Sequence, residues 1–144
     1  MHSYRNKTTL PFTSKQLFEV VIDVESYPIF LPWCIACKIV NKYSNYDFDA
    51  DLTVGYKAID EKYTSKIKAD YPMTINSKAI SGPFKYLDST WTFKDTSDGQ
   101  CEVYFGIEYK FKSFFLDKIM GGLFKKATIK MLDAFEQRAR SLHN

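Results

Sequence analysis

The sequence has no long run of apolar residues. A helix that crosses a membrane needs about 18 such residues or more, and no stretch of the 144 residues approaches that length. The first residues pass almost at once into a strand-like pattern, with no signal or transit peptide. We therefore expect a cytoplasmic protein, a protein that lies peripherally on the inner face of a membrane, or a processed form.

Cysteine and histidine are scarce, which limits redox and metal chemistry. Three cysteines in this setting indicate free thiols rather than a disulfide framework. The segment 33–38 resembles the active-site hexapeptide of thioredoxin, but that site needs a helix beginning at the first cysteine. A strand pattern follows here instead. Cys34, Cys37 and Cys101 leave a zinc site without a fourth ligand, and both histidines lie near the termini. We predict neither a redox site nor a metal site.

Arginine occurs only at Arg5, Arg138 and Arg140, so the positive charge rests mostly on lysine, and the formal net charge is only +3. Proteins that read a nucleic-acid sequence favour the fork of arginine for bases and phosphates. We therefore expect no sequence-specific binding of nucleic acid. A general electrostatic attraction to phosphate stays open.

The sequence also lacks the patterns of common catalytic sites. It contains no glycine-rich phosphate loop, no nucleophile elbow and no internal histidine. Asp23 and Glu25 would lie on different faces of a helix. The strand carboxylates are assigned to the solvent-facing side: Asp49, Asp51, Glu102 and Glu108. We predict no catalytic residues and do not expect an enzyme.

Apolar residues recur every three or four positions from Phe114 to His143. This spacing predicts a single amphipathic helix, with Ser113 as N-cap and Asp117 in its first turn. Gly121-Gly122 would cost this helix roughly 1 kcal/mol each relative to alanine. We interpret the pair either as a bend or close approach that serves a gate, or as a tight crossing over a neighbouring element.

Before this helix, most of the chain alternates apolar and polar residues, as antiparallel strands with one wet face do. The patterns cover residues 3–10 and continue through residues 35–111, with turns at Gly82-Pro83 and Ser97-Asp98-Gly99. One shared face is assigned to four residues: Ile35, Cys37, Ile39 and Tyr43.

Two short helical segments follow the first strand. Thr13 or Ser14 can cap the first, and residues 24–31 continue as a short helix or turn. Together the elements predict one α+β domain over residues 1–144, of the helix-grip class. It would have a curved antiparallel sheet of about seven strands, a small helical insert after strand 1 and a long C-terminal helix.

Aromatic residues are abundant, with 12 Phe and 10 Tyr. On the concave face of such a sheet they would form either ordinary core or the wall of an apolar ligand pocket. The candidate ligand-binding residues are Trp33, Phe48, Tyr56, Trp91, Phe93, Phe105, Tyr109, Phe111, Met120, Leu123 and Phe124. The few polar groups would be Ser65, Ser89 and the hydroxyls of Tyr56 and Tyr109.

A short apolar segment bounded by proline, Tyr27 to Trp33, allows two interpretations. If it is buried, it closes one end of the chamber; if it is exposed, it forms a lip that faces lipid or membrane. The candidate gate or membrane-contact residues are Tyr27, Ile29, Phe30, Leu31, Gly121 and Gly122.

The segment Val21 to Cys34 resembles the signature of the coenzyme Q-binding START-domain family, within the polyketide cyclase/dehydrase and lipid-transport group. Its most specific part is Tyr-Pro-Ile-Phe-Leu-Pro-Trp-Cys. Further similar positions extend over the chain: Gly82-Pro83-Phe84-Lys85, Leu87, Trp91, Phe93, Phe111-Lys112-Ser113 and Ala134 to Ala139. Cys37 departs from the family, whose members commonly carry a small hydroxyl residue near it.

The resemblance implies a START/Bet v 1-like helix-grip domain with a hydrophobic tunnel. It implies that the protein binds ubiquinone or a similar isoprenoid lipid in support of the respiratory chain. Burial of the apolar surface of the ligand would provide the binding free energy. A first alternative, also known in the family, is a toxin of a toxin–antitoxin pair that binds the large ribosomal subunit and blocks subunit association. A second is a polyketide cyclase/aromatase, for which no acid–base pair is visible.

Overall fold

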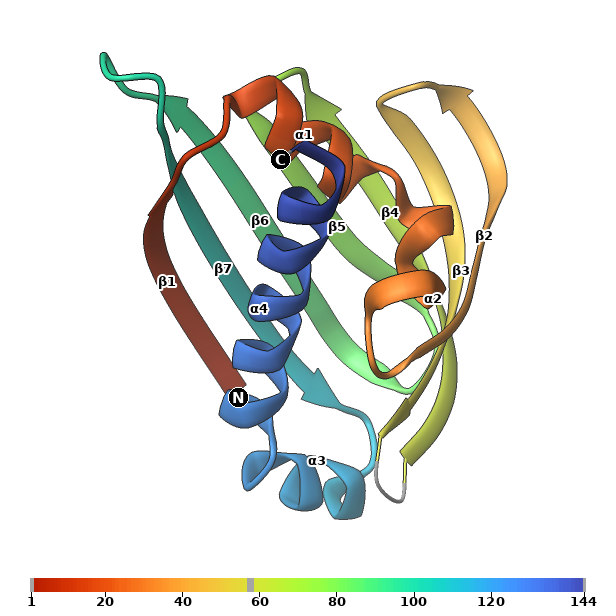
Figure 1. Cartoon of the computed structure of the whole chain (residues 1–144). Coiled ribbons are helices and arrows are strands. Elements are labelled where there is room, and N and C mark those ends of the chain that lie inside the picture. The colour runs from red at the N-terminus through yellow and green to blue at the C-terminus, as the bar shows by residue number, and fades with distance from the viewer. Residues whose placement is uncertain (1, 57–58, 144) are drawn as a thin grey trace.

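The computed structural model describes residues 2–56 and 59–143, with only the backbone described for Tyr56 and Ile59 (Figure 1). One seven-stranded sheet has the order β1-β7-β6-β5-β4-β3-β2, and all neighbouring strands are antiparallel. The predicted helix-grip class is therefore confirmed. The strands are β1 (His2–Leu10), β2 (Cys34–Ser44), β3 (Asp47–Tyr56), β4 (Ile59–Asp70), β5 (Thr74–Ser81), β6 (Phe84–Asp95) and β7 (Cys101–Phe111).

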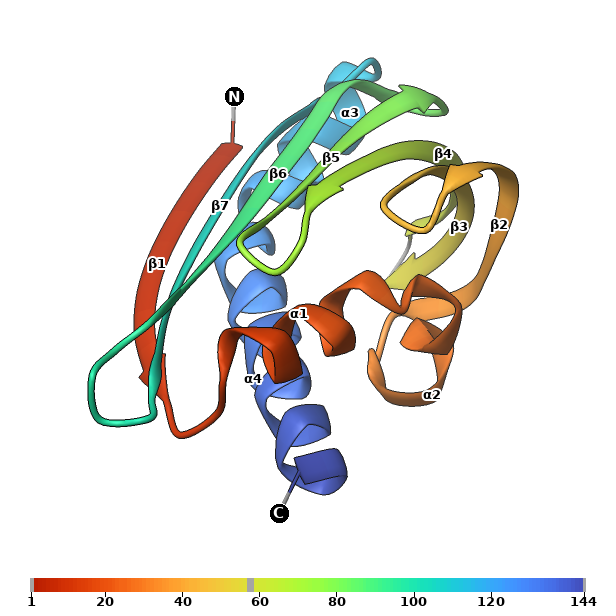
Figure 2. The same cartoon turned by 90° about the horizontal axis from the view of Figure 1, so that it is seen from above.

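Helices lie on the concave side of the sheet. Figure 2 shows the strands curving around the longest helix, which crosses that side diagonally. The helices are α1 (Ser14–Ile22), the 3-10 helix η1 (Val24–Ser26), α2 (Tyr27–Phe30), α3 (Phe114–Gly121) and α4 (Phe124–His143).

The start of α1 confirms the predicted cap. The backbone N–H of Gln16 donates to Thr13 Oγ1 at 3.1 Å, and the Thr13 N–H donates to Gln16 Oε1 at 2.9 Å, which together form a capping box. The Ser14 backbone N–H and hydroxyl each donate to the Asp95 carboxylate at 2.7 Å. These bonds fix the insert to the end of β6.

Strand β2 does not keep the predicted single face. Its pairing with β3 shifts register between Cys34 and Ala36 and again between Ile39 and Asn41. An extra residue in one strand reverses the alternation of side chains beyond it. Ile35 and Tyr43 are consequently exposed, whereas Cys37 and Ile39 are half-buried.

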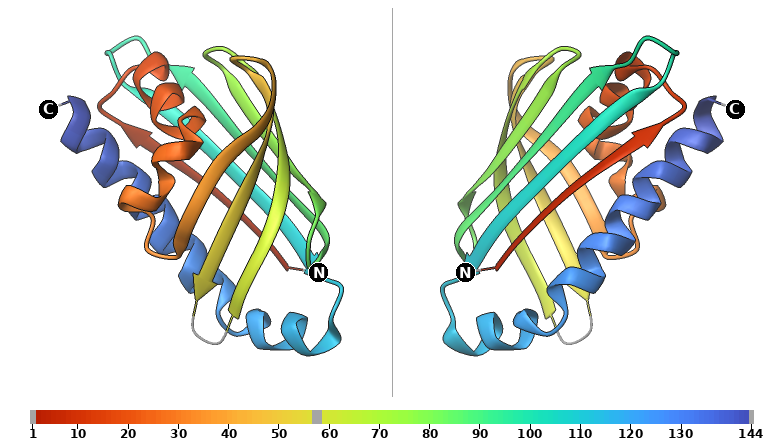
Figure 3. Two further views of the ribbon diagram at one scale, coloured as in Figure 1. Left: turned by 90° about the vertical axis from the view of Figure 1, so that its right-hand side faces the viewer. Right: turned by 90° about the vertical axis from the view of Figure 1, so that its left-hand side faces the viewer.

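The C-terminal segment is two helices, so the prediction of one continuous helix was wrong. Ser113 caps α3 as predicted, accepting a hydrogen bond from the Leu116 N–H at 3.2 Å. The chain leaves helical geometry at Gly122-Leu123, where the Leu123 N–H donates to the Met120 carbonyl at 3.0 Å. Figure 3 shows α3 crossing the open end of the sheet at an angle to α4. The glycines permit this break because glycine favours a continuous helix less than any other residue except proline.

The core lies between the sheet, α1 and α4, and a second buried cluster of Tyr109, Phe111 and Phe124 lies beneath the α3–α4 junction. On the other side of the sheet, Asp49 is only 6% exposed, which corrects its assignment to solvent. The Asn41 amide donates to its carboxylate at 3.3 Å, and the Lys66 ammonium lies 3.7 Å away. Neighbouring side chains therefore cover this carboxylate and compensate its charge.

Candidate functional site

Three adjoining cavities lie between the concave face of the sheet and the helices. The lower cavity, beside α3, has a volume of about 180 Å³; the middle and upper cavities have about 130 and 140 Å³. Trp33, Leu87 and Met131 line both the lower and the middle cavity. Trp91 and Phe135 line both the middle and the upper cavity. Because their walls are shared, we treat them as one chamber, which is mainly apolar except in the upper cavity, where Asn6, Thr8, Asp133 and Glu136 also line the wall.

Most of the predicted ligand-binding residues meet in this chamber, although their contact with a ligand stays a prediction. Trp33 and Trp91 each line two cavities. The other predicted residues in the chamber wall are Phe93, Phe105, Tyr109, Phe111, Met120 and Phe124.

Three predicted residues are not placed in the chamber. Phe48 is fully buried in the core and borders a separate surface groove beside Ile39 and Arg138. Leu123 is half-buried at the α3–α4 junction. Because the helix breaks there, Leu123 does not continue the apolar face that the prediction of a single helix assumed. The side chain of Tyr56 lies outside the described part of the structure.

Sequence reasoning missed several wall residues, above all Phe135. Its ring lies 5.1 Å from Trp91 and 5.3 Å from both Tyr27 and Phe30, measured between centroids. It stands where the middle and upper cavities meet. The three- and four-residue spacing placed Phe135 on the buried face of the helix, but a periodic pattern does not distinguish a chamber wall from solid core.

Hydroxyl groups form a small polar spot in the middle cavity. The Ser77 and Ser89 Oγ atoms are 2.6 Å apart, on directly paired residues of β5 and β6. Ser65, from β4, is buried and lines the same cavity. Ser65 and Ser89 were predicted as polar groups of the site, whereas Ser77 was missed because β5 has a weak strand pattern.

The Tyr109 hydroxyl is buried beneath the α3–α4 junction, and no hydrogen-bond partner for it is found among the described residues. Burial, with a smaller contribution from the Asp117 carboxylate, raises the pKa of Tyr109 above its ordinary value. Tyr109 is therefore a protonated, unused hydrogen-bond donor in the wall of the lower cavity.

The cysteine pair occupies the start of a strand, as predicted, because β2 begins at Cys34. Burial raises the pKa of Cys34 to about 11. Burial, with a smaller contribution from the neighbouring Cys34 thiol, raises the pKa of Cys37 to about 12. The Cys34 thiol donates weakly to the Ala36 carbonyl at 3.7 Å. Both groups are thus protonated thiols at neutral pH, which makes them poor nucleophiles.

Most of the segment from Tyr27 to Trp33 packs against the core, as the first of its two interpretations expects, whereas a role as gate or membrane contact stays a prediction. The Tyr27 hydroxyl donates to the Val21 carbonyl, and Leu31 is buried in the core. The Arg138 guanidinium lies 5.4 Å from the centre of the Phe30 ring. Ile29, which is 72% exposed, projects into solvent, and Pro32 is exposed as well.

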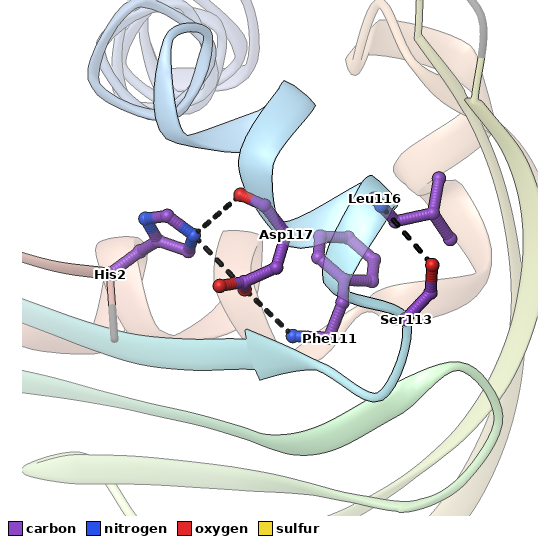
Figure 4. A network of polar contacts seen from close by, with 5 residues as sticks. All are labelled: His2, Phe111, Ser113, Leu116 and Asp117. Atoms are coloured by element: carbon purple, nitrogen blue, oxygen red, sulfur yellow. Dashed lines mark hydrogen bonds and ion pairs between the residues drawn. The ribbon is translucent and has the colours of Figure 1, made fainter.

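The lower end of the chamber is held by a clasp between β1 and α3 (Figure 4). His2 Nε2 lies 3.1 Å from both the carbonyl oxygen and Oδ1 of Asp117, and the Phe111 N–H donates to the same Oδ1 at 3.0 Å. A Cβ on Gly121 would lie 3.2 Å from His2 Cε1, whereas one on Gly122 would have 3.9 Å of space. Gly121 therefore lies close to His2 of the neighbouring strand β1, as the interpretation of a tight crossing expects, whereas the role of the pair in a gate stays a prediction.

The described helices include none that is both long and apolar enough to span a membrane. Within residues 2–56 and 59–143, no three His, Cys, Asp or Glu side chains cluster in a way that could hold a metal ion.

Similarity to known proteins agrees with this architecture. The chain is 42% identical to a protein of Rickettsia prowazekii named ribosome association toxin RatA, over 99% of both chains. It is 27% identical to the Xenopus laevis mitochondrial coenzyme Q-binding protein COQ10 homolog B, covering 97% of this chain and 59% of that one.

Solved structures show the same fold. An 18 kDa protein of Caulobacter crescentus, 35% identical, superposes with a TM-score of 0.79 over 99% of both chains. An aromatase/cyclase of Streptomyces sp. R1128 superposes with a TM-score of 0.84 over 96% of this chain and 93% of that one. Its identity of 12% shows a shared fold and nothing about catalysis.

The profile of one family, described as polyketide cyclase/dehydrase and lipid transport, matches residues 10–136. This span runs from the end of β1 to the last third of α4 and includes most of the chamber wall. This chain belongs to the polyketide cyclase/dehydrase and lipid transport family.

Proposed function

We propose that this protein acts on the ribosome and restrains the joining of its subunits. The observation that carries the proposal is the 42% identity, over 99% of both chains, to a relative named as a ribosome association toxin. Lysine supplies 17 of the 20 basic residues. The attraction between lysine side chains and RNA phosphates does not depend on the base sequence. A protein that occupies the large subunit in this way would keep the small subunit from joining.

Sedimentation tests this proposal directly. Separated subunits are mixed with increasing amounts of the purified protein, and the joined ribosome is followed on sucrose gradients. We expect the protein to travel with the large subunit, and the joined ribosome to decline as protein is added. Both effects should weaken as salt is raised, because released counterions drive the binding. Unchanged joining, with all the protein at the top of a low-salt gradient, would refute the proposal.

A second candidate function is the binding of ubiquinone or a similar isoprenoid lipid, in support of respiration. The observation that favours it is the apolar chamber, with the Ser77–Ser89 hydroxyl pair as a polar spot within it. A long isoprenoid tail would gain free energy from burial there, at roughly 25 cal/mol per Å² of apolar surface. The relative named for coenzyme Q binding gives further support.

Native mass spectrometry, with organic extraction of the bound material, tests the second candidate. Trp33 and Trp91 both line the chamber, so an added quinone should quench the fluorescence of both. The Trp33→Phe and Trp91→Phe variants should each retain part of the quenching. Protein that emerges empty and whose fluorescence is unchanged by quinone would exclude this ligand class, and the ribosome test would be unaffected.

A further inference from the structure

Helix α3 presents two aromatic side chains to solvent. Phe114 is 83% exposed and Phe115 is 70% exposed, and they are neighbours in the first turn. Leu116 and Met120, on the other side of the same helix, pack against the cluster beneath the α3–α4 junction. The exposed pair therefore contributes little to the fold, although phenylalanine is among the residues that burial favours most.

The segment of the chain that contains this pair is strongly basic. Residues 110–130 contain six lysines and one acidic residue, Asp117, which gives a formal charge of +5. The whole chain carries +3, so the remaining residues carry −2. The Asp117 carboxylate is itself occupied by His2 and the Phe111 N–H. Positive charge is thus concentrated in the segment of the chain that contains the exposed aromatic pair.

The same segment borders the chamber. Phe111 and Met120 line the lower cavity, so the exposed pair lies between two wall residues in the chain. Figure 3 shows α3 as the outermost element at that end of the molecule. A flat surface that met α3 would therefore lie beside the end of the chamber.

We propose that α3 docks this protein on an anionic lipid bilayer. Phe114 and Phe115 would enter the boundary between headgroups and acyl chains, and the lysines of residues 110–130 would contact lipid phosphate. A short amphipathic helix with exposed aromatic residues, set within a lysine-rich segment, is suited to such an interface. The inference goes beyond either candidate function, since neither ribosome binding nor ligand burial requires a membrane.

Vesicle flotation tests the proposal. The full chain is mixed with vesicles of phosphatidylglycerol and phosphatidylcholine, or with vesicles of phosphatidylcholine alone. We expect binding to the anionic vesicles that falls with salt. The Phe114→Ser/Phe115→Ser variant should lose about tenfold or more in affinity. The Lys118→Glu/Lys125→Glu/Lys126→Glu variant should lose a similar amount or more.

Matched controls place the same changes elsewhere. Ile35→Ser/Tyr43→Ser removes an exposed apolar pair from β2, and Lys15→Glu/Lys38→Glu/Lys94→Glu makes the same charge change outside residues 110–130. The apolar control should bind the vesicles as the wild type does. The charge control should lose clearly less than the residue 118–126 variant.

A fluorescent reporter keeps the test decisive if a docking variant fails to fold. Phe115→Trp should show a blue shift on adding anionic vesicles and quenching by brominated acyl chains. An unshifted Phe115→Trp signal would overturn the proposal. It would also be overturned if the serine variant floated like the wild type, or if the glutamate variant lost ribosome binding while vesicle binding was unchanged.

Discussion

The imidazole of His2 and the carboxylate of Asp117, 115 residues apart in the chain, meet at 3.1 Å between Nε2 and Oδ1. Because Oδ1 also accepts the Phe111 N–H, one carboxylate connects β1, the end of β7 and α3. The ring of His2 also lies 4.9 Å from that of Tyr109 and 5.9 Å from that of Phe124. This clasp holds α3 against the end of the chamber.

The clasp predicts how stability depends on pH. The Phe111 N–H, and then the attraction of His2, hold the pKa of Asp117 below its ordinary value of 3.8. A carboxyl whose pKa is lower in the folded state stabilises it above the ordinary value, and this contribution is lost as pH falls through the lowered pKa. The Tm of Asp117→Asn should therefore lie below that of the wild type at pH 5 to 6, and the difference should shrink below about pH 3.8.

Thermal melts across this pH range make the measurement, with Asp70→Asn as the control at an exposed carboxylate. A difference for Asp117→Asn that stays constant down to the lowest pH would contradict the linkage.

The two glycines should respond differently to alanine. Gly122 has φ −87° and ψ −12°, and its added methyl would meet no atom closer than 3.9 Å, so Gly122→Ala should raise the free energy of unfolding by up to about 1 kcal/mol. Gly121→Ala should gain less or lose stability, because its methyl would lie 3.2 Å from His2 Cε1.

Denaturant unfolding of a double-mutant cycle isolates that contact. In a His2→Ala background, Gly121→Ala should become more favourable than in the wild type. Equal effects in the two backgrounds would show that the ring does not restrain position 121.

Filling the chamber should block a ligand and leave the fold intact. Met131 lines both the lower and the middle cavity, so Met131→Trp adds bulk where they join. We expect uptake of an isoprenoid quinone to fall about tenfold or more, with a change of roughly 1–3 kcal/mol in the free energy of unfolding. Ile129→Trp adds similar bulk two positions away, at an exposed site, and should leave uptake unchanged. Equal uptake by both variants would show that the ligand binds outside the chamber.

The thiols should react slowly. With pKa values of about 11 and 12, Cys34 and Cys37 contain little thiolate at neutral pH. Alkylation by iodoacetamide at pH 7 should be roughly a hundredfold or more slower than for a small thiol of pKa about 8.5, and should accelerate with rising pH. The Cys34→Ala/Cys37→Ala variant should fold and bind quinone as the wild type does. Rapid alkylation at pH 7, or loss of binding in the folded variant, would contradict this view.

The predictions from local pattern succeeded where one residue's neighbours in sequence are also its neighbours in space. Thr13 caps α1 and Ser113 caps α3 because a cap bonds to the helix turn that follows it. The turns at Gly82 and Gly99, with φ of 111° and 81°, formed where glycine allows positive φ. The alternation in β7 placed Phe105, Tyr109 and Phe111 on the concave face, because every second side chain of a strand lies on the same face of the sheet.

The errors arose where contacts distant in sequence decided the outcome. Register shifts against β3 turned Ile35 and Tyr43 outward in β2, and Lys66 of β4 helps to bury the Asp49 carboxylate. The hydrophobic pattern continued through Gly121-Gly122, whereas in the structure the helix ends there and α3 crosses the end of the sheet.

The sequence by itself determined the helix-grip class, most of the strands and the caps, because these follow from hydrophobic periodicity and local hydrogen bonds. The tertiary structure alone decided which aromatic residues form the chamber, that Ser77 pairs with Ser89, and that His2 holds Asp117. Those arrangements depend on the curvature of the sheet and on the angle between α3 and α4. Both are set by packing over the whole domain, which a local sequence pattern does not record.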